Sequence, residues 1–453
     1  MLSTFVTLLA LLLAVLFWWV RRTFTFWNGK GIAHLTFWQY MRFAYDIYTK
    51  LSQSVGSDVW KKSILNLSGE EWKKARAIFT PALTATRLKT IVAKAKTIAG
   101  RMTSRVMDAA TKNNPVEFFE LATNTALDTT AVLNYSVDID SHNDKNHPLM
   151  KCLETIYMGT SGWKLVMLFL MPTVYKVLQP DYPPKSSTDV FKAFVSHLIE
   201  ERKSKNKEED DFLQVLMNAD YNWEDNAAAK AENAEIKKMS LDEITAQGIV
   251  FFSAGVETVS MTLSLTTYYL ALNPDCQDRV ITEIDKGLTK GELTYDALQE
   301  MPYLDACIKE AMRICTPGSI TMRVCTEETT VAGIRFKPGM CVDIPMAGIH
   351  HDSEYFPEPD KFNPERFMPE NKDALMPFTY IPFGAGPRNC VGMRLGLIQV
   401  KITLACLLQH VKLETCPETP VPLKFKPGQL HPVFDGGLHL RAVPRQHSAS
   451  SVS

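Results

Sequence analysis

One long apolar segment, Ser240–Asp275, constrains the fold of this chain more than any other feature. It opens with Ser240 and Glu243 in the spacing of a capping box, and we expect the helix to stop before Pro274. Its middle is apolar on nearly every side, so a helix formed here has no face suited to water. The chain is therefore predicted to fold around one buried central helix.

The rest of the pattern is mostly helical, and the few predicted strands come late in the chain. Ser68 and Glu71 form a second capping box at the start of a predicted helix. Short alternating runs broken by Gly and Pro-Gly predict strands and a turn within 329–346. Prolines recur every few residues over 355–387 and predict a long ordered loop. The expected fold class is mainly α with a small β-sheet region.

Charge and cysteine usage exclude several classes of protein. Lys and Arg number 49 against 50 Asp and Glu, and no basic stripe or tail occurs, so we expect no nucleic-acid partner. The cysteines number nine, an odd count, and none forms a CxxC pair. This pattern indicates reduced thiols in a cytosolic environment and argues against a disulfide framework or a zinc finger.

The N-terminus predicts a membrane anchor. Leu2–Val20 carries no charge, and its length is close to the ~20 residues that a helix needs to cross a bilayer. Trp18 and Trp19 stand at its end, where aromatic rings favour the interface, and two arginines follow. The positive-inside rule then places the body of the protein in the cytosol. A cleaved signal peptide is the weaker alternative, because a basic n-region and a small-residue cleavage site are missing.

Cys390 lies in a loop crowded with Gly and Pro, directly before an apolar run that is typical of a helix. Unpaired backbone N–H groups and the positive end of a helix dipole both favour a thiolate there. The glycines allow backbone conformations closed to other residues and let a flat ligand approach closely. Arg388 adds a cation near the sulfur. Such a loop suits a porphyrin iron, with the sulfur as axial ligand and the arginine at a propionate.

Three other interpretations of Cys390 fit the sequence less well. A dinucleotide-binding loop would read GxGxxG, but Asn389 stands where the third glycine belongs. A nucleophilic cysteine would need a histidine partner, and the sequence marks none of the ten histidines for that role. An inert thiol is the commonest state of a cysteine, yet it leaves the clustered glycines and Arg388 without a purpose.

The loop resembles the haem-binding signature of the cytochrome P450 family. Five positions match at fixed spacing: Phe383, Gly386, Arg388, Cys390 and Gly392. The surrounding sequence is most similar to the microsomal drug- and steroid-oxidising branch that also includes thromboxane synthase. The resemblance implies the P450 fold, with haem b as cofactor, Cys390 as the iron ligand and the other four residues in contact with the haem.

The segment Ala254–Thr258 of the central helix is similar to the oxygen-activation motif of that family. A mid-helix glycine costs ~1 kcal/mol relative to alanine. Thr258 can bond back to the carbonyl of Ala254 and bend the helix, so Gly255 and Thr258 predict a local groove for a diatomic ligand. Glu257 and the Thr258 hydroxyl are candidate proton sources. The resemblance implies catalytic roles for Thr258 and Glu257 and haem contacts for Ala254 and Gly255, whereas a kinked core helix is the plainer alternative.

Two further sets of residues match family patterns. Glu310 and Arg313, three positions apart on one helix face, and Arg366 in the proline-rich loop resemble the buried triad that secures the haem loop. Indole N–H and guanidinium groups donate hydrogen bonds to carboxylates. Three residues resemble propionate-binding positions: Trp72, Arg76 and Arg323.

The resemblance implies a monooxygenase that inserts one atom of O2 into a lipophilic small molecule, such as a steroid, a fatty acid or a xenobiotic. Electrons would come from NADPH-cytochrome P450 reductase, with cytochrome b5 as a second donor. A single-pass anchor would hold the chain in the endoplasmic reticulum membrane, with the catalytic domain in the cytosol. Four residues would line the substrate site: Phe251, Phe252, Ile320 and Leu430. The alternatives are a haem-thiolate isomerase or dehydratase that rearranges a peroxide, and a catalytically impaired haem-binding protein.

The chain departs from the family pattern before Trp72. No proline precedes Pro81, and the stretch between the anchor and Trp72 is shorter than in the family. This predicts an incomplete N-terminal lobe with an exposed sheet edge. The expected organisation is an anchor (1–22), a shortened linker and lobe remnant (23–60), a haem-thiolate catalytic domain (61–445) and a disordered tail (446–453).

Overall fold

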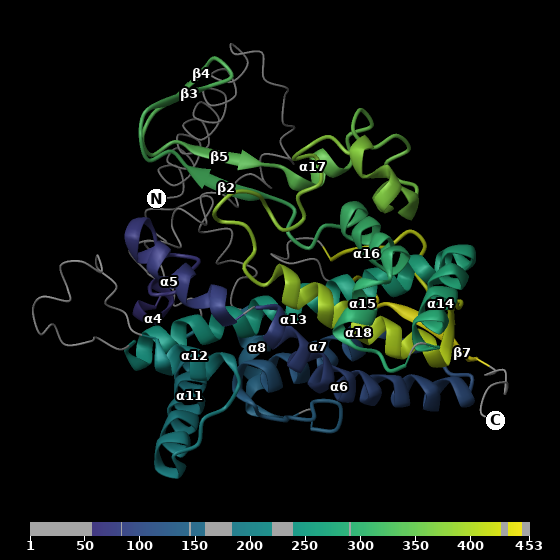
Figure 1. The fold of residues 1–453 in the computed structure, drawn as a ribbon, viewed down its shortest axis with the longest axis horizontal. Coiled ribbons are helices and arrows are strands. Elements are labelled where there is room, and N and C mark those ends of the chain that lie inside the picture. Colours follow the sequence, from purple (N-terminus) through teal and green to yellow (C-terminus); the bar gives the residue numbers. More distant parts are fainter. Residues whose placement is uncertain are drawn as a thin grey trace, which may run out of the picture.

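A computed structural model describes residues 57–82, 84–144, 146–158, 184–219, 239–289, 291–426 and 434–445. In this part of the chain, helices pack around one long central helix, and short strands lie at the margin (Figure 1). The expectation of a mainly α fold with a small β region is confirmed. The predicted anchor and tail, and most of the predicted linker, lie outside the described residues.

The central helix, α13 (Leu241–Leu272), is the predicted buried helix. The Ser240 hydroxyl accepts a hydrogen bond from the Glu243 N–H, and the Glu243 carboxylate accepts one from the Ser240 N–H. The helix stops before Pro274, as expected. Among the described helices, α13 alone is long and apolar enough to cross a bilayer, and 67% of its most apolar stretch is buried in protein. The molecule is therefore built outward from this helix.

The other long helices surround α13. It contacts α7 (Phe118–Tyr135), α11 (Lys185–Lys205), α16 (Pro302–Ile314) and α18 (Met393–His410), while α6 (Ala85–Thr111) packs on both α7 and α18. The remaining helices are α4 (Asp58–Lys61), α5 (Gly69–Ala82), α8 (Pro148–Met158), α12 (Phe212–Asn218), α14 (Pro274–Leu288), α15 (Tyr295–Gln299), α17 (Met346–His350) and the 3-10 helices η1 (Pro364–Phe367) and η2 (Pro369–Ala374).

The strands of the described part form three small antiparallel sheets. One has the order β1 (Val116–Glu117), β7 (His439–Pro444), β6 (Val411–Glu414). The others pair β2 (Thr321–Val324) with β5 (Cys341–Ile344), and β3 (Thr329–Val331) with β4 (Ile334–Phe336). The predicted strands and turn within 329–346 are thus confirmed. The β2–β5 and β3–β4 pairs lie together on one side of the helical body (Figure 1).

The first described segment is fastened to the central helix by one buried amide. Gln247 of α13 accepts a hydrogen bond from the Ile64 N–H at 2.9 Å and donates one to the Lys62 carbonyl at 2.7 Å. Asp242, in the first turn of α13, pairs with Lys62 and with Lys192 of α11. These contacts set where the chain enters α5, which carries part of the site.

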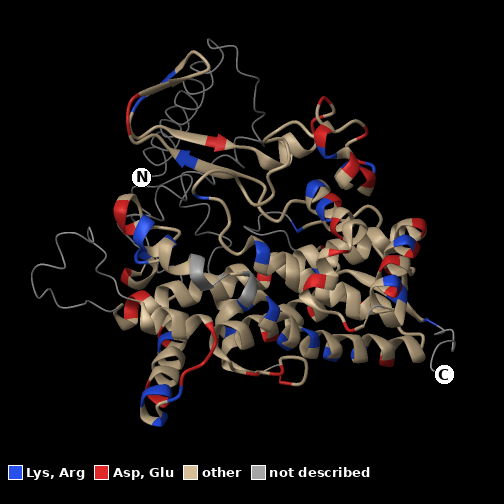
Figure 2. Ribbon diagram, in the orientation of Figure 1, with Lys and Arg blue, Asp and Glu red and all other residues tan. Residues whose placement is uncertain are grey.

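Charged residues of both signs are interspersed over the outer helices and loops (Figure 2). The middle of α13 carries few of them, which agrees with its burial. The long segment within 355–387 is an ordered loop with two 3-10 turns, as predicted.

The turn Met376–Thr379 near the end of this loop is strained. The Thr379 N–H donates to the Met376 carbonyl, and Phe378 adopts φ +67° with 74% of its side chain exposed. An aromatic residue in this left-handed region costs about 1–2 kcal/mol. We expect Phe378→Gly to raise the free energy of unfolding by up to about 1 kcal/mol in chemical denaturation, because glycine adopts this φ without strain. Phe378→Ala, which keeps the strain, is the control, and equal effects of both variants would contradict the prediction.

Candidate active site

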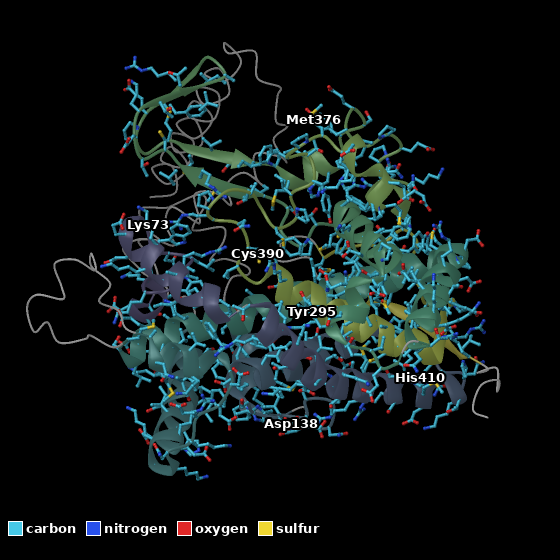
Figure 3. The ribbon with its side chains drawn as sticks, in the orientation of Figure 1. Lys73, Asp138, Tyr295, Met376, Cys390 and His410 are labelled. Carbon is cyan, nitrogen blue, oxygen red and sulfur yellow. The ribbon has the colours of Figure 1, made fainter. Side chains whose placement is uncertain are left out.

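Cys390 lies in the middle of the molecule, just before α18 begins (Figure 3). The loop around it is held by its own backbone: the Cys390 N–H donates to the Phe383 carbonyl at 2.8 Å, and the Asn389 N–H donates to the Gly386 carbonyl at 3.0 Å. Gly384 and Gly386 adopt φ +69° and +77°, which glycine alone adopts easily. The side chain of Cys390 is exposed. The loop thus presents its sulfur outward on a rigid frame.

The groups around the Cys390 sulfur have opposite effects on its pKa. Burial raises the pKa of the Cys390 thiol, while the N–H of Gly392, the charge of Arg76 and the N–H of Met393 lower it. The net direction is upward, because burial outweighs the N–H groups at the helix start, which act in the predicted direction. The sulfur remains accessible from one side. A metal cation bound there would displace the proton and reverse the balance.

Two arginines from distant parts of the chain clamp the cysteine loop. Arg76 of α5 donates to the backbone carbonyl of Asn389 at 2.9 Å and to its side-chain oxygen at 2.8 Å. Arg323 of β2 donates to the Ala385 carbonyl at 3.0 Å. Both residues were predicted at propionate-binding positions, and both reach the loop. Asn389 itself was missed, because its partner lies far away in the sequence.

Arg388 stands at the mouth of the same loop. Its guanidinium lies 4.4 Å from the ring centre of Trp72 and donates to the Leu67 carbonyl. Burial and then the charge of Arg323 lower the pKa of Arg388. Neither Arg323 nor Arg388 forms an ion pair with a carboxylate of the described chain. Two neighbouring guanidiniums without an anion fit an anionic ligand such as a carboxylate.

One strip of the central helix beside this loop, formed by Ala254 and Thr258, is exposed and is called the open strip below. Thr258 donates its hydroxyl to the Ala254 carbonyl at 2.8 Å, as predicted, and both residues are exposed although the helix is otherwise largely buried. The first turn of α18 touches α13 beside this strip, since a Cβ on Gly396 would lie 3.8 Å from the Val259 side chain. A Cβ on Gly255 would lie 3.3 Å from the Thr130 hydroxyl of α7, so this glycine also permits close helix packing.

The structure corrects one predicted substrate contact. Phe252 is fully buried and packs edge-on against Tyr135 and at 5.5 Å from Phe191, on the α7 and α11 side of the central helix. It points away from the open strip, because Ala254 and Thr258, two and six positions later, lie about 200° and about 240° around the helix axis from it. An apolar run shows that a residue is inside, but it does not show which side of the helix faces the site.

The other predicted substrate contacts have different outcomes. Phe251 is half-buried, stacks on Phe212 at 4.3 Å between ring centres and meets Phe79 at 4.7 Å in a tilted arrangement. Phe251 lines a small cavity of about 30 Å³, whose lining includes neither Cys390 nor Thr258. Ile320 is half-buried directly before β2 and stays a prediction. Leu430 lies outside the described residues.

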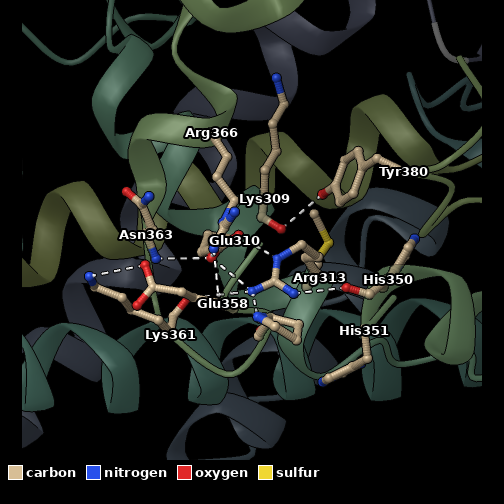
Figure 4. Close-up of polar contacts among 12 residues, drawn as sticks. Lys309, Glu310, Arg313, His350, His351, Glu358, Lys361, Asn363, Arg366 and Tyr380 are labelled. Carbon is tan, nitrogen blue, oxygen red and sulfur yellow. Dashed lines mark hydrogen bonds and ion pairs between the residues drawn. The ribbon is translucent and has the colours of Figure 1, made fainter. Parts of the chain in front are cut away.

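The predicted triad is present, with Glu310 and Arg313 buried and Arg366 largely buried (Figure 4). Arg313 donates to both carboxylate oxygens of Glu310, at 2.7 and 2.9 Å, and Arg366 lies 3.4 Å from the same carboxylate. Glu310 and Arg313 have no solvent exposure. The Asn363 N–H also donates to Glu310. This confirms the arrangement that the spacing and the family resemblance predicted.

The triad holds the proline-rich loop through backbone carbonyls. Arg313 donates to the carbonyls of His350 and Pro359, and Arg366 donates to those of Pro357 and Glu358. The two guanidiniums therefore fasten the first half of the loop that leads to the cysteine. His350 had no signal in the sequence, which contains ten histidines.

The donor set fits haem. An accessible sulfur on a rigid loop matches an iron ligand. Arg323 and Arg388, which pair with no carboxylate of the described chain, match the two propionates. The open strip of α13 supplies a small hydroxyl beside the loop. A mainly helical fold with this combination of groups defines the class of haem-thiolate proteins.

Comparisons with known proteins agree. The family profile described as Cytochrome P450 matches residues 15–433. Cytochrome P450 3A41 of Mus musculus is 35% identical over 408 residues, which cover 88% of this chain and 79% of that protein. Cytochrome P450 3A2 of Rattus norvegicus is 35% identical over 370 residues, which cover 80% of this chain and 72% of that protein. Cytochrome P450 3A31 of Mesocricetus auratus is 34% identical over 408 residues, which cover 88% of this chain and 79% of that protein.

The chain belongs to the cytochrome P450 family. It is an oxidoreductase, a haem-thiolate monooxygenase that uses O2 and acts on lipophilic substrates. The family and branch expected from the cysteine loop and the central helix are confirmed.

Proposed function

We propose that this chain oxidises a steroid, a fatty acid or a xenobiotic with electrons from NADPH-cytochrome P450 reductase, and that cytochrome b5 can supply the second electron. The observation that carries the proposal is the accessible Cys390 on a clamped loop, beside the open strip of α13. Haem, when bound, supplies the activation of O2 and the oxidation of a C–H or C=C bond. The chain would hold the cofactor and handle protons.

Each site residue has a proposed task toward the cofactor. Cys390 would hold the haem iron through its thiolate, which donates electron density to the metal. Residues that hold the propionates are Trp72, Arg76, Arg323 and Arg388. Residues that would contact the bound haem are Ala254, Gly255, Phe383, Gly386 and Gly392. For Trp72 the support is indirect, since its ring face is occupied by Arg388 and its indole N–H is the group left to bind a carboxylate.

Thr258 and Glu257 are the proposed proton-handling residues. The Thr258 hydroxyl gives its hydrogen to the Ala254 carbonyl, so its oxygen lone pairs are available to accept a proton or a hydrogen bond from water in the strip. To donate, the hydroxyl must turn away from Ala254, which a threonine does by rotating one bond. Glu257 is half-buried one position earlier and can replenish that proton.

The proposed setting is the endoplasmic reticulum membrane, with a single-pass anchor at 1–22 and the catalytic domain, 61–445, in the cytosol. The uncharged segment Leu2–Val20 and the arginines after it support this orientation. The proposed linker, 23–60, is short and leaves the N-terminal lobe incomplete.

The test uses the full chain in lipid with purified reductase, NADPH and three probes: testosterone, lauric acid and an alkoxycoumarin. We expect NADPH-dependent product from at least one probe and none without reductase. Conversion of a lipid hydroperoxide without NADPH or reductase would favour the isomerase or dehydratase alternative. A red-shifted CO complex without either activity would indicate an impaired haem-binding protein.

A further inference from the structure

We propose that His350 is a positioning residue for the cysteine ligand: its neutral imidazole holds the backbone of Ile381, from which the cysteine loop begins. The proposal rests on Cys390 as the axial ligand and goes beyond it, since His350 touches neither the cysteine nor the residues assigned to the haem. His350 ends α17 and has no solvent exposure. Its Nε2 lies 3.0 Å from the Ile381 N–H, and its Nδ1 lies 2.8 Å from the Thr316 hydroxyl.

The hydrogen bonds around the ring run in one direction only. The Thr316 hydroxyl gives its single hydrogen to the Met312 carbonyl at 2.9 Å, so its oxygen accepts from His350 Nδ1–H. The Ile381 N–H donates to Nε2, which must therefore carry no proton. This pattern assigns one neutral tautomer. Burial and then the charge of Arg313 lower the pKa of His350 to about 4, which agrees with a neutral ring.

The ring has little freedom to move. It stacks on Tyr380 at 5.4 Å and 29° and meets Phe356 edge-on at 6.4 Å. The backbone carbonyl of His350 accepts a hydrogen bond from Arg313, so the same residue is tied to the buried triad (Figure 4). Tyr380 is held in turn by its hydroxyl, which donates to the Lys309 carbonyl. His350 thus joins the triad to the second half of the proline-rich loop.

From Ile381 the restraint passes to the sulfur through the backbone. The Ile381 carbonyl accepts from the Gly384 N–H at 2.9 Å, and the Phe383 carbonyl accepts from the Cys390 N–H at 2.8 Å. The Ile381 amide itself is buried, so without His350 it must find another acceptor or remain unsatisfied. A shift of this amide moves the carbonyl that fixes Cys390, whereas the triad contacts described above restrain only the earlier half of the loop.

The decisive experiment compares His350→Gln with His350→Asn. A glutamine oxygen can reach the place of Nε2 and accept from Ile381, whereas the shorter asparagine reaches only the place of Nδ1. We measure how fast the red-shifted Soret band of the reduced CO complex converts to the unshifted band, at fixed temperature and with total haem content recorded. We expect conversion about tenfold faster in His350→Asn than in the wild type, and close to wild type in His350→Gln.

Two further variants separate positioning from general destabilisation. His350→Phe keeps the ring without an acceptor, and we expect it to lose the shifted band before the helical circular dichroism falls. His351→Phe is the matched control, since that neighbour bonds only its own helix at Ala347, and we expect no change. Equal rates for the Gln and Asn variants would overturn the proposal even if the Phe variant fails to fold. A wild-type protein without the shifted band would instead overturn Cys390 as ligand.

Discussion

Cys390→Ala is expected to abolish the red-shifted Soret band of the reduced CO complex and to lower NADPH-dependent turnover by at least about 10³-fold, which corresponds to about 4 kcal/mol in activation free energy. The band reports a thiolate bound to iron, and the loop segment 383–392 contains no other cysteine and no methionine. The loop should still fold in the variant, because it is held by the backbone amide of Cys390 and by the carbonyl and side chain of Asn389. Reduced-CO spectroscopy and a turnover assay measure both effects.

The matched control is Cys416→Ala. Cys416 is a half-buried free thiol that contacts the Thr419 hydroxyl, far from the cysteine loop along the chain. We expect this variant to keep both the shifted band and the turnover. If the shifted band survives in Cys390→Ala, the ligand assignment is wrong.

Glu310→Gln is expected to lower the free energy of unfolding by about 3–5 kcal/mol, because it leaves the buried Arg313 and the largely buried Arg366 without an anion. The carbonyls that these arginines also bond cannot neutralise two charges. The amide of the variant can accept from only one side, so at least one guanidinium hydrogen bond is lost as well. Chemical denaturation of the haem-loaded protein measures the change, and the fraction of protein that retains haem should fall with it.

Glu365→Gln provides the comparison, because Glu365 lies in η1 beside Arg366 but outside the triad. Glu365 pairs with Arg279 at the surface, where the two side chains are 43% and 54% exposed. Surface pairs contribute about 0–1 kcal/mol, so we expect a loss within that range. A loss in Glu310→Gln no larger than that in Glu365→Gln would show that the buried triad is not a main support of the loop.

The features predicted correctly are those that nearby residues determine. The capping box at Ser240 and the pairing of Glu310 with Arg313 depend on spacings of three residues, which a helix converts directly into contacts. The Thr258 bond to Ala254 follows the same logic at a spacing of four. Local spacing therefore predicted the central helix and much of the triad.

The features that were missed depend on partners brought together by folding. Asn389 meets Arg76 across 313 positions, and His350 meets Ile381 across 31. The misplaced Phe252 shows a different limit, because an apolar run on all sides of a helix does not identify the side that faces the ligand. The pKa of Cys390 shows a third: the helix start is visible in the sequence, but the desolvation that outweighs it is not.

The bond between Gln247 and the backbone at Lys62 and Ile64 has a consequence for how the chain tolerates change in length. It gives the catalytic body a defined starting point that does not depend on what lies upstream. Insertions or deletions before Lys62 can then alter the membrane-proximal part while the helices behind this joint keep their alignment. The amide of Gln247 thus fixes the position of the backbone at Lys62 and Ile64 against α13, and this lets one haem-bearing body accept N-terminal regions of different size.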